Sequence, residues 1–192
     1  PRAPDPPVFG GGRVGPGRAA LPRPGDPDPL ALDLDLVERS LVEFLREEFQ
    51  RRRGFERAVV GVSGGVDSAV SLALACRALG PENVHGFRLP YRTSSQESLD
   101  HATLVLEQTG AQAHTIDISE PVDRYVEAYE PDVPPLRKGN LMARLRAVVL
   151  FDQSAKLGAL PLGTGNKSER LLGYFTWHAD DSPPINPLGD LF

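Results

Sequence analysis

Six residues, 63–68 (Ser-Gly-Gly-Val-Asp-Ser), have the composition of a loop that binds phosphate. They follow an apolar stretch, residues 58–62, that predicts a buried strand, and they precede a run of small and apolar residues, 69–78, that predicts a helix. Backbone N–H groups in such a turn point inward, and the dipole of the following helix adds positive potential. Gly64 and Gly65 let a phosphate approach the backbone closely because they carry no Cβ. The stretch therefore predicts an anion site.

The loop also contains an acid, Asp67, which fits a phosphate site if a divalent cation lies between the carboxylate and the phosphate oxygens. In this loop no lysine follows the glycines, and the glycines do not have the spacing Gly-x-Gly-x-x-Gly, so it matches neither of the two common phosphate loops. The six residues resemble the pyrophosphate loop of the N-type ATP pyrophosphatases, which split ATP between its α and β phosphates and adenylate a substrate. An ordinary Gly-rich turn is the alternative.

The elements around this loop alternate between strand and helix patterns. An alternating order predicts an α/β fold, a doubly wound parallel sheet with helices on both faces. Ligands of such sheets bind at the carboxyl ends of the strands, where the Ser63 loop, the Tyr91 loop and Thr164 all fall. The expected strands are 58–62, 84–89, 113–118 and 159–163, and the expected helices are 34–53, 69–78, 95–108, 120–129 and 140–157.

Composition excludes several classes of function. The net charge of −5 gives no electrostatic support for a nucleic-acid partner. Cys76 is the only cysteine, so neither a disulfide within the chain nor a cysteine metal site is expected, which fits a reducing cytoplasm. No apolar run approaches the roughly 20 residues of a membrane span, so no membrane partner is expected.

Residues 1–30 contain nine prolines and six glycines and few large apolar residues, which predicts a disordered leader. Residues 31–192 then form the expected ATP pyrophosphatase domain. The chain begins at Pro1 rather than at methionine and ends at Phe192 within a motif. We therefore expect a fragment at both ends, with the domain incomplete at its C-terminus.

Three further stretches carry polar groups that would suit a nucleotide site. Residues 137–146 place Arg144 and Arg146 two positions apart on a helix, so that one can face a ligand while the other lies on the surface. Residues 162–169 bring Thr164 and, one helical turn on, Glu169, whose alternative role is that of a capping acid. Residues 172–181 combine three aromatic residues and a histidine with two acids, which suits either a stacked ring or a core cluster.

Together with the loop, these stretches resemble the ammonia-dependent NAD synthetases over roughly residues 31–192. The resemblance implies that the loop and its flank bind the ATP phosphates and that Thr164 contacts ATP. It implies that Asp67 and Glu169 hold Mg²⁺ and that Arg144 contacts the dinucleotide. It also implies a homodimer with the dinucleotide site at the subunit interface. The implied phosphate-binding residues are Gly61, Val62, Ser63, Gly64, Gly65, Val66, Asp67 and Ser68.

The reaction implied by the resemblance converts deamido-NAD to NAD. The carboxylate attacks the α-phosphate of ATP to give an NAD-adenylate and pyrophosphate, and ammonia then displaces AMP. The sequence departs from the family at two positions that contact deamido-NAD: Trp177 replaces a lysine and Pro184 an aspartate. We expect Trp177 to stack on the substrate and Asp180, with Asp181, to supply the carboxylate locally. A lysine that contacts ATP is expected immediately after Phe192.

Three alternatives remain open from the sequence. A glutamine-dependent NAD synthetase would share this domain, and a GMP synthetase-like enzyme would share the first loop but not Gly173-Tyr174-Phe175-Thr176. A non-catalytic nucleotide-binding module is the alternative of a different class. Because ATP binding alone does not require two metal carboxylates, Asp67 together with Glu169 favours an enzyme.

Overall fold

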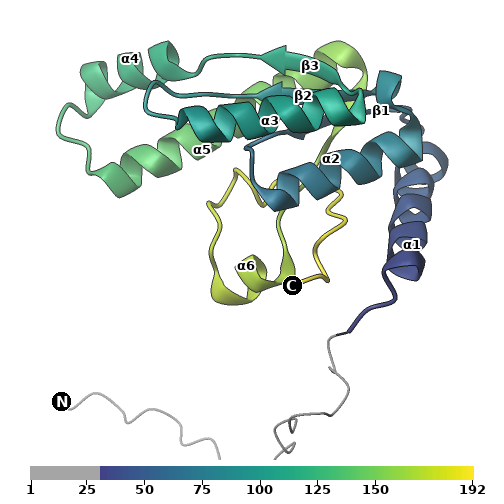
Figure 1. Cartoon of the computed structure of the whole chain (residues 1–192). Helices are drawn as coiled ribbons and strands as arrows, with labels where there is room; N and C mark the ends of the chain where they lie inside the picture. Colours follow the sequence, from purple (N-terminus) through teal and green to yellow (C-terminus); the bar gives the residue numbers. More distant parts are fainter. Residues whose placement is uncertain (1–30) are drawn as a thin grey trace, which may run out of the picture. The chain divides into compact units, whose positions relative to one another are not determined.

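The fold is built on one parallel sheet. The computed structural model describes residues 31–192, and the predicted leader, residues 1–30, lies outside the described residues. The sheet has the strand order β3-β2-β1-β4, and every neighbouring pair is parallel. The strands are β1 (Arg57–Gly61), β2 (Val84–Arg88), β3 (Gln112–Thr115) and β4 (Ala159–Leu162). Helices separate them, as Figure 1 shows: α1 (Leu34–Arg46), α2 (Val66–Leu79), α3 (Gln96–Thr109), α4 (Ser119–Tyr129), α5 (Pro135–Leu157) and α6 (Lys167–Leu172).

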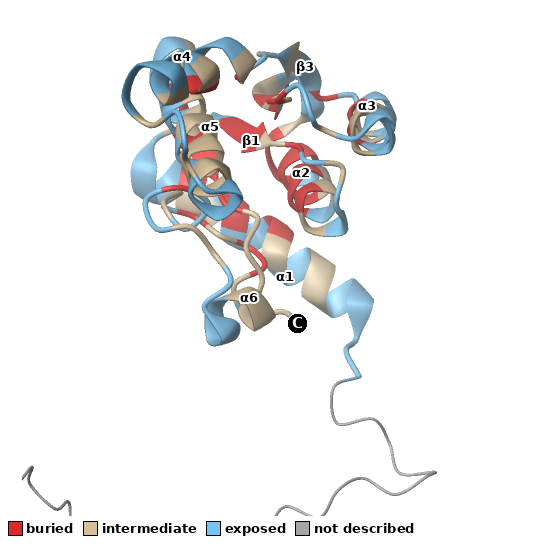
Figure 2. Cartoon of the chain, turned by 90° about the vertical axis from the view of Figure 1, so that its left-hand side faces the viewer, coloured by how far each residue is buried: buried red, intermediate tan, exposed pale blue. Residues whose placement is uncertain are grey.

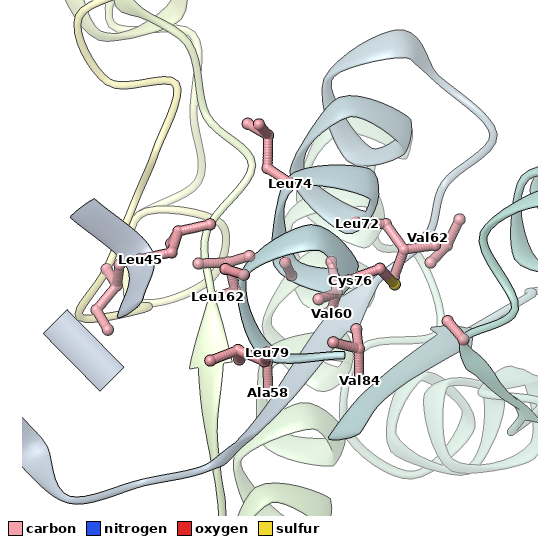
Figure 3. Close-up of a cluster of buried hydrophobic side chains, with 14 of the residues drawn as sticks. Leu45, Ala58, Val60, Val62, Leu72, Leu74, Cys76, Leu79, Val84 and Leu162 are labelled. Carbon is pink, nitrogen blue, oxygen red and sulfur yellow. The ribbon is translucent and has the colours of Figure 1, made fainter. Parts of the chain in front are cut away.

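The helices cover both faces of the sheet, which confirms the predicted doubly wound architecture. On one face, Ala58, Val60 and Val84 pack with apolar residues of α1, α2 and α3 (Figure 3). On the other face, Val59 and Phe87 pack with α4 and α5. Figure 2 shows β1 between α2 and α5, with buried (red) parts of the ribbon in all three elements. Because side chains alternate along a strand, both faces of β1 must be apolar, and its central residues 58–60 are fully buried.

The strand order places a switch point between β1 and β4. The chain passes from β1 to β2 to β3 in one direction, and α4 and α5 then carry it back to the far side of β1. Neighbouring loops at such a point leave the sheet in opposite directions and open a crevice at the carboxyl ends. Ser63 follows β1 and Thr164 follows β4, so both lie at this crevice.

Two helices differ most from the sequence prediction; in addition, α2 begins at Val66 rather than at residue 69, and β3 ends at Thr115 rather than at residue 118. The helix expected over 34–53 is α-helical only to Arg46 and continues as a π-helical segment, Glu47–Arg52, whose Phe49 is fully buried. A π segment takes more residues per turn than the 3.6-residue pattern assumes, so periodicity did not detect it. Helix α5 begins at Pro135 rather than at residue 140, because proline is well suited to the first position of a helix.

The chain after α6 returns to the sheet edge. The Gly163 N–H donates to the Ile185 carbonyl at 2.7 Å, and Leu162 and Ile185 form an isolated parallel bridge. Ile185 and Leu188 are buried in the same core as α1 and α2. The residues beyond Gly173 are therefore part of the compact unit Leu34–Phe192. Within residues 31–192 no helix is long and apolar enough to cross a membrane.

Candidate functional site

The loop after β1 is shaped by its own serine hydroxyls. The Ser63 N–H donates to Ser68 Oγ at 3.2 Å, and the two serine hydroxyls lie 3.1 Å apart. The Gly65 N–H donates to Ser63 Oγ, also at 3.2 Å. Ser68 is buried, whereas Val66 at the start of α2 is 73% exposed. The backbone N–H groups of the first turn of α2 have no acceptor within the helix, so the loop presents donors at its open side.

Gly64 lies where this loop meets α3. Its φ is +89°, and a Cβ built on it would lie 2.2 Å from the Ser98 carbonyl oxygen. A backbone oxygen at that distance leaves no room for any side chain, and the positive φ independently favours glycine. The loop thus packs directly on the first turns of α3, whose Ser95 caps the helix by accepting from the Ser98 N–H.

A cavity of about 430 Å³ opens at the carboxyl edge of the sheet. Apolar side chains of the strand ends and of α5 form much of its wall, and hydroxyls of Ser63, Ser98 and Thr164 lie along it. This is the composition of a site for a largely apolar ring with a few oriented polar groups. The strand ends that contribute are Gly61, Val62 and Ser63 after β1, Phe87, Leu89 and Pro90 around the end of β2, and Leu162, Gly163 and Thr164 at the end of β4.

The structure thus brings four of the predicted ATP-contacting residues to one cavity. These are Gly61, Val62, Ser63 and Thr164. The other five lie beside it, in the turn and in the first turn of α2: Gly64, Gly65, Val66, Asp67 and Ser68. The ends of β1, β2 and β4 therefore line one cavity, as the sequence predicts for the position of these strand ends.

The two predicted metal ligands meet at Asn166. The Asn166 side chain donates from Nδ2 to Asp67 Oδ1 at 3.3 Å. The same asparagine caps α6: its Oδ1 accepts from the Glu169 N–H at 2.9 Å, and Glu169 Oε2 accepts from the Asn166 N–H at 3.0 Å. Glu169 therefore does cap the helix, as its alternative role predicts. Its Oε1 has no hydrogen bond from any described residue and is open to a ligand.

Arg144 and Arg146 diverge as their spacing predicts. Arg144 is exposed, and its Nε donates to the Trp177 carbonyl at 3.1 Å. Arg146 lines the cavity, and its Nε donates to the Leu89 carbonyl at 3.0 Å. Burial lowers the pKa of the Arg146 guanidinium from its ordinary value. The spacing left open which arginine faces a ligand, and the resemblance pointed to Arg144. The structure places Arg146 in this cavity and Arg144 outside it.

The aromatic segment after α6 is folded over α5. Both carboxylate oxygens of Asp180 accept from the Thr176 N–H, at 3.0 and 3.2 Å, and Asp180 also lines the cavity. The Thr176 hydroxyl donates to Asn140 Oδ1 at 3.1 Å. Trp177 is 67% exposed, so for this residue the core alternative is wrong. Arg144, Trp177 and Asp180 are brought together in this one segment and its contact with α5.

Asn166 was not among the predicted site residues, although the sequence around it contains a capping pattern. Asparagine three residues before a glutamate is a capping-box pattern, and it fixes both the start of α6 and the position of Glu169. The contact with Asp67 carried no such signal, because it joins residues 99 positions apart.

A parallel sheet with the Ser63 loop and Thr164 on either side of its switch point is a nucleotide-binding type of α/β fold. Together with the solved NAD synthetase structures that it resembles, it gives the class: the adenine nucleotide alpha hydrolase-like fold. Comparison with known proteins gives the family. The sequence model described as NAD synthase matches residues 37–192. The chain therefore belongs to the NAD synthase family.

Curated relatives and solved structures agree with this assignment. The chain is 47% identical over 167 residues to the NH3-dependent NAD+ synthetase of Chlorobaculum parvum, and this alignment covers 87% of the chain and 60% of that protein. It is 50% identical over 163 residues to that of Chlorobium phaeovibrioides, covering 85% and 58%. Among solved structures, the NH3-dependent NAD synthetase of Campylobacter jejuni superposes with a TM-score of 0.79 at 33% identity, covering 84% of the chain and 69% of the other.

A second solved structure, the glutamine-dependent NAD+ synthetase of Acinetobacter baumannii in complex with ADP, also gives a TM-score of 0.79, at 32% identity. The alignment covers 87% of the chain and 32% of that protein. The chain spans about 60% of the length of the curated relatives it matches.

Proposed function

We propose that the chain carries out ATP-dependent amidation of deamido-NAD to NAD, with ammonia as the nitrogen donor and with AMP and pyrophosphate as the other products. The observation that carries the proposal is the convergence of the Ser63 loop and Thr164 on one cavity in a chain of the NAD synthase family. Its relatives at 47–50% identity are NH3-dependent NAD+ synthetases.

In this account the Ser63 loop holds the triphosphate of ATP. The donors at the start of α2 and the helix dipole stabilise negative charge on the leaving pyrophosphate. The apolar wall of the cavity takes the adenine, and Thr164 contacts the nucleotide. The carboxylate of deamido-NAD attacks the α-phosphate, and ammonia then attacks the acyl carbon and releases AMP. Both nucleophiles belong to the substrates, so the protein contributes chiefly alignment and electrostatic stabilisation.

Asp67 and Glu169 are proposed to hold Mg²⁺. Among residues 31–192 no group of three or more His, Cys, Asp or Glu side chains gathers into a metal cluster. A pair of carboxylates is nevertheless what Mg²⁺ takes from a protein when phosphate oxygens and water complete its shell. The shared contact with Asn166 holds the two acids at one place, and Glu169 Oε1 is open there, so the residues fit the ion. Bound Mg²⁺ would neutralise charge on the phosphates.

Arg144, Trp177 and Asp180 are proposed to bind deamido-NAD. Trp177 presents an exposed indole on the segment that Arg144 holds through the Trp177 carbonyl. An exposed indole suits stacking on the pyridine ring. Asp180 reaches the cavity from the same segment, so the dinucleotide would lie between this segment and the Ser63 loop.

Ammonia is proposed as the nitrogen donor on the basis of sequence identity to relatives, because the fold does not distinguish between donors. The ammonia-dependent and the glutamine-dependent synthetase structures have the same TM-score, so the shape of this domain does not distinguish the two donors. The 47–50% identity to NH3-dependent relatives favours ammonia.

We also propose a homodimer in the cytoplasm. Large apolar side chains are exposed on α4 and α5 outside the cavity, and a second copy could cover them. They are Tyr125, Tyr129, Leu136 and Val148. The only cysteine, Cys76, is buried, and burial raises the pKa of its thiol to about 11, which makes it unreactive. A single cysteine cannot form a disulfide within the chain, which suits a reducing compartment. Light scattering of the purified chain tests the dimer: a mass of two chains is expected, and a monomer would contradict it.

The reaction is tested by pyrophosphate release from ATP and Mg²⁺ with a panel of acids. Deamido-NAD with ammonia should give release, whereas xanthosine monophosphate, the acid of GMP synthetases, should not. Glutamine in place of ammonia should not support NAD formation. Release with xanthosine monophosphate but not with deamido-NAD would assign the chain to another amidating pyrophosphatase. ATP binding without release for any acid would favour a nucleotide-binding module.

A further inference from the structure

Arg146 is the one arginine of the residues 137–146 motif that faces the cavity. It lies on the side of α5 that also presents Ala143, Ala147 and Leu150 to the same space. Its Nε donates to the Leu89 carbonyl at the end of β2, which fixes the guanidinium at the carboxyl edge of the sheet. Arg137 and Arg144, by contrast, lie outside this cavity.

The rest of the Arg146 guanidinium has no partner in the described part of the chain. None of the ion pairs there includes Arg146, and its only hydrogen bond is the one from Nε. The buried polar atoms without a partner include Arg88 Nε but no nitrogen of Arg146. The Nη groups of Arg146 are therefore accessible, and they are not sealed in the core.

A partly buried cation without a carboxylate is an unusual arrangement, because loss of water is not offset by an ion pair. Arg137 shows the ordinary case, since it pairs with both carboxylate oxygens of Glu130. Asp180 also lines the cavity, but it forms no ion pair with Arg146, and its oxygens accept from the Thr176 N–H. The Nη donors of Arg146 are therefore not occupied by any carboxylate of the described residues.

We infer that Arg146 binds an oxyanion of the nucleotide substrates through its Nη groups, while its Nε keeps it fixed on the Leu89 carbonyl. This inference rests on the proposed function. The proposed substrates bring two oxyanions to the cavity: the α-phosphate of ATP and the carboxylate of deamido-NAD. Either is recognised by the planar donor pair of a guanidinium, and a lysine would match it less well. Arg146 would thus be a binding residue for the reacting groups.

The test compares ligands that differ only in the oxyanion. Calorimetric titration of the 192-residue chain gives the dissociation constants of two ligand pairs, AMP with adenosine and deamido-NAD with NAD. Each is measured for wild type and for Arg146→Gln. Glutamine can still donate to the Leu89 carbonyl, so the local fold should be kept. In one of the two pairs, we expect Arg146→Gln to weaken binding of the ligand that carries the tested oxyanion about tenfold or more, and to change binding of the ligand that lacks it by no more than about twofold.

The two arms distinguish the sources: a selective loss for AMP assigns the phosphate, and a selective loss for deamido-NAD assigns the carboxylate. Arg146→Lys should recover part of the loss, and Arg124→Gln, an exposed arginine on α4, should change nothing. Equal losses for both members of each pair, or no loss at all, would overturn the inference while leaving the proposed function intact. If wild type binds none of the four ligands, the proposed function fails together with the inference.

Discussion

Gly64 and the Ser98 carbonyl oxygen are in such close approach that a Cβ at Gly64 would lie 2.2 Å from that oxygen. The contact joins the loop after β1 to the first turns of α3, and both elements line or border the same cavity. The shape of the loop therefore depends on the position of α3 as well as on the serine hydroxyls within the loop.

Replacing Gly64 by alanine should destabilise the fold and weaken ATP binding together. The positive φ alone costs about 1–2 kcal/mol, and the overlap with a backbone oxygen adds to that cost. Gly54→Ala is the matched control, because Gly54 has a φ of +70° and nothing within 4 Å of its Cβ position. Urea unfolding should show a larger loss of stability in Gly64→Ala than in Gly54→Ala. Titration with MgATP should show a loss of affinity only in Gly64→Ala. Equal effects in the two variants would contradict the packing argument.

Glu169 offers a way to separate capping from metal binding. In Glu169→Gln the side-chain oxygen can still accept from the Asn166 N–H, so the cap of α6 should survive while the negative charge is lost. We expect its free energy of unfolding to stay within about 0.5 kcal/mol of wild type. The enhancement of ATP binding by Mg²⁺ should fall about tenfold or more, and Asp67→Asn should lower it similarly.

The control for the charge change is Glu127→Gln on α4, far along the chain from both acids, which should leave the Mg²⁺ effect unaltered. Glu169→Ala should lose stability as well, by about 1 kcal/mol, because it removes the cap. If Glu169→Gln binds MgATP as wild type does, Glu169 is a capping residue and not a metal ligand.

The paired histidines on β2 and β3 predict a pH-dependent stability. His85 Nδ1 lies 3.1 Å from His114 Nε2, and His114 stacks on Phe87. Burial lowers the pKa of both rings, and the neighbouring ring and Arg57 lower the pKa of His85 further, as Lys156 does for His114. The unfolded chain therefore binds protons more tightly than the folded one. Stability from the pair is complete above the unfolded pKa of about 6.5 and is lost as the pH falls below it.

Urea unfolding at intervals between pH 8 and pH 5 checks this sign. Wild type should lose stability over the lower half of that range, and His114→Gln should show a smaller loss. His101→Gln, an exposed histidine on α3, is the control and should behave as wild type. Identical pH profiles for wild type and His114→Gln would contradict the prediction.

The parts of the fold that the sequence reveals are those governed by local patterns. Alternation of strand and helix, the apolar run before Ser63 and the small residues of α2 were enough to predict the parallel sheet and its ligand edge. The π-helical turn that buries Phe49 was missed, because its period differs from that of an α-helix. The predicted start of α5, residue 140, is five residues late, because a proline suits a loop as well as the first turn of a helix.

The site was less accessible from sequence, because its geometry joins distant residues. Spacing showed that Arg144 and Arg146 diverge, yet the face that meets the cavity depends on how α5 packs on the sheet. The contact of Asn166 with Asp67 depends on the neighbouring positions of β1 and β4, which only the strand order fixes. The metal and dinucleotide roles of these residues stay predictions.

The most direct test of the account follows the oxygen atoms of the substrate. Deamido-NAD labelled with ¹⁸O in its carboxylate would be incubated with the chain, ATP, Mg²⁺ and ammonia, and the AMP would be analysed by mass spectrometry. If the carboxylate attacks the α-phosphate and ammonia then releases AMP, one labelled oxygen per turnover must appear in AMP and none in pyrophosphate. AMP without label, or label in inorganic phosphate with ADP as product, would contradict adenylation at this site.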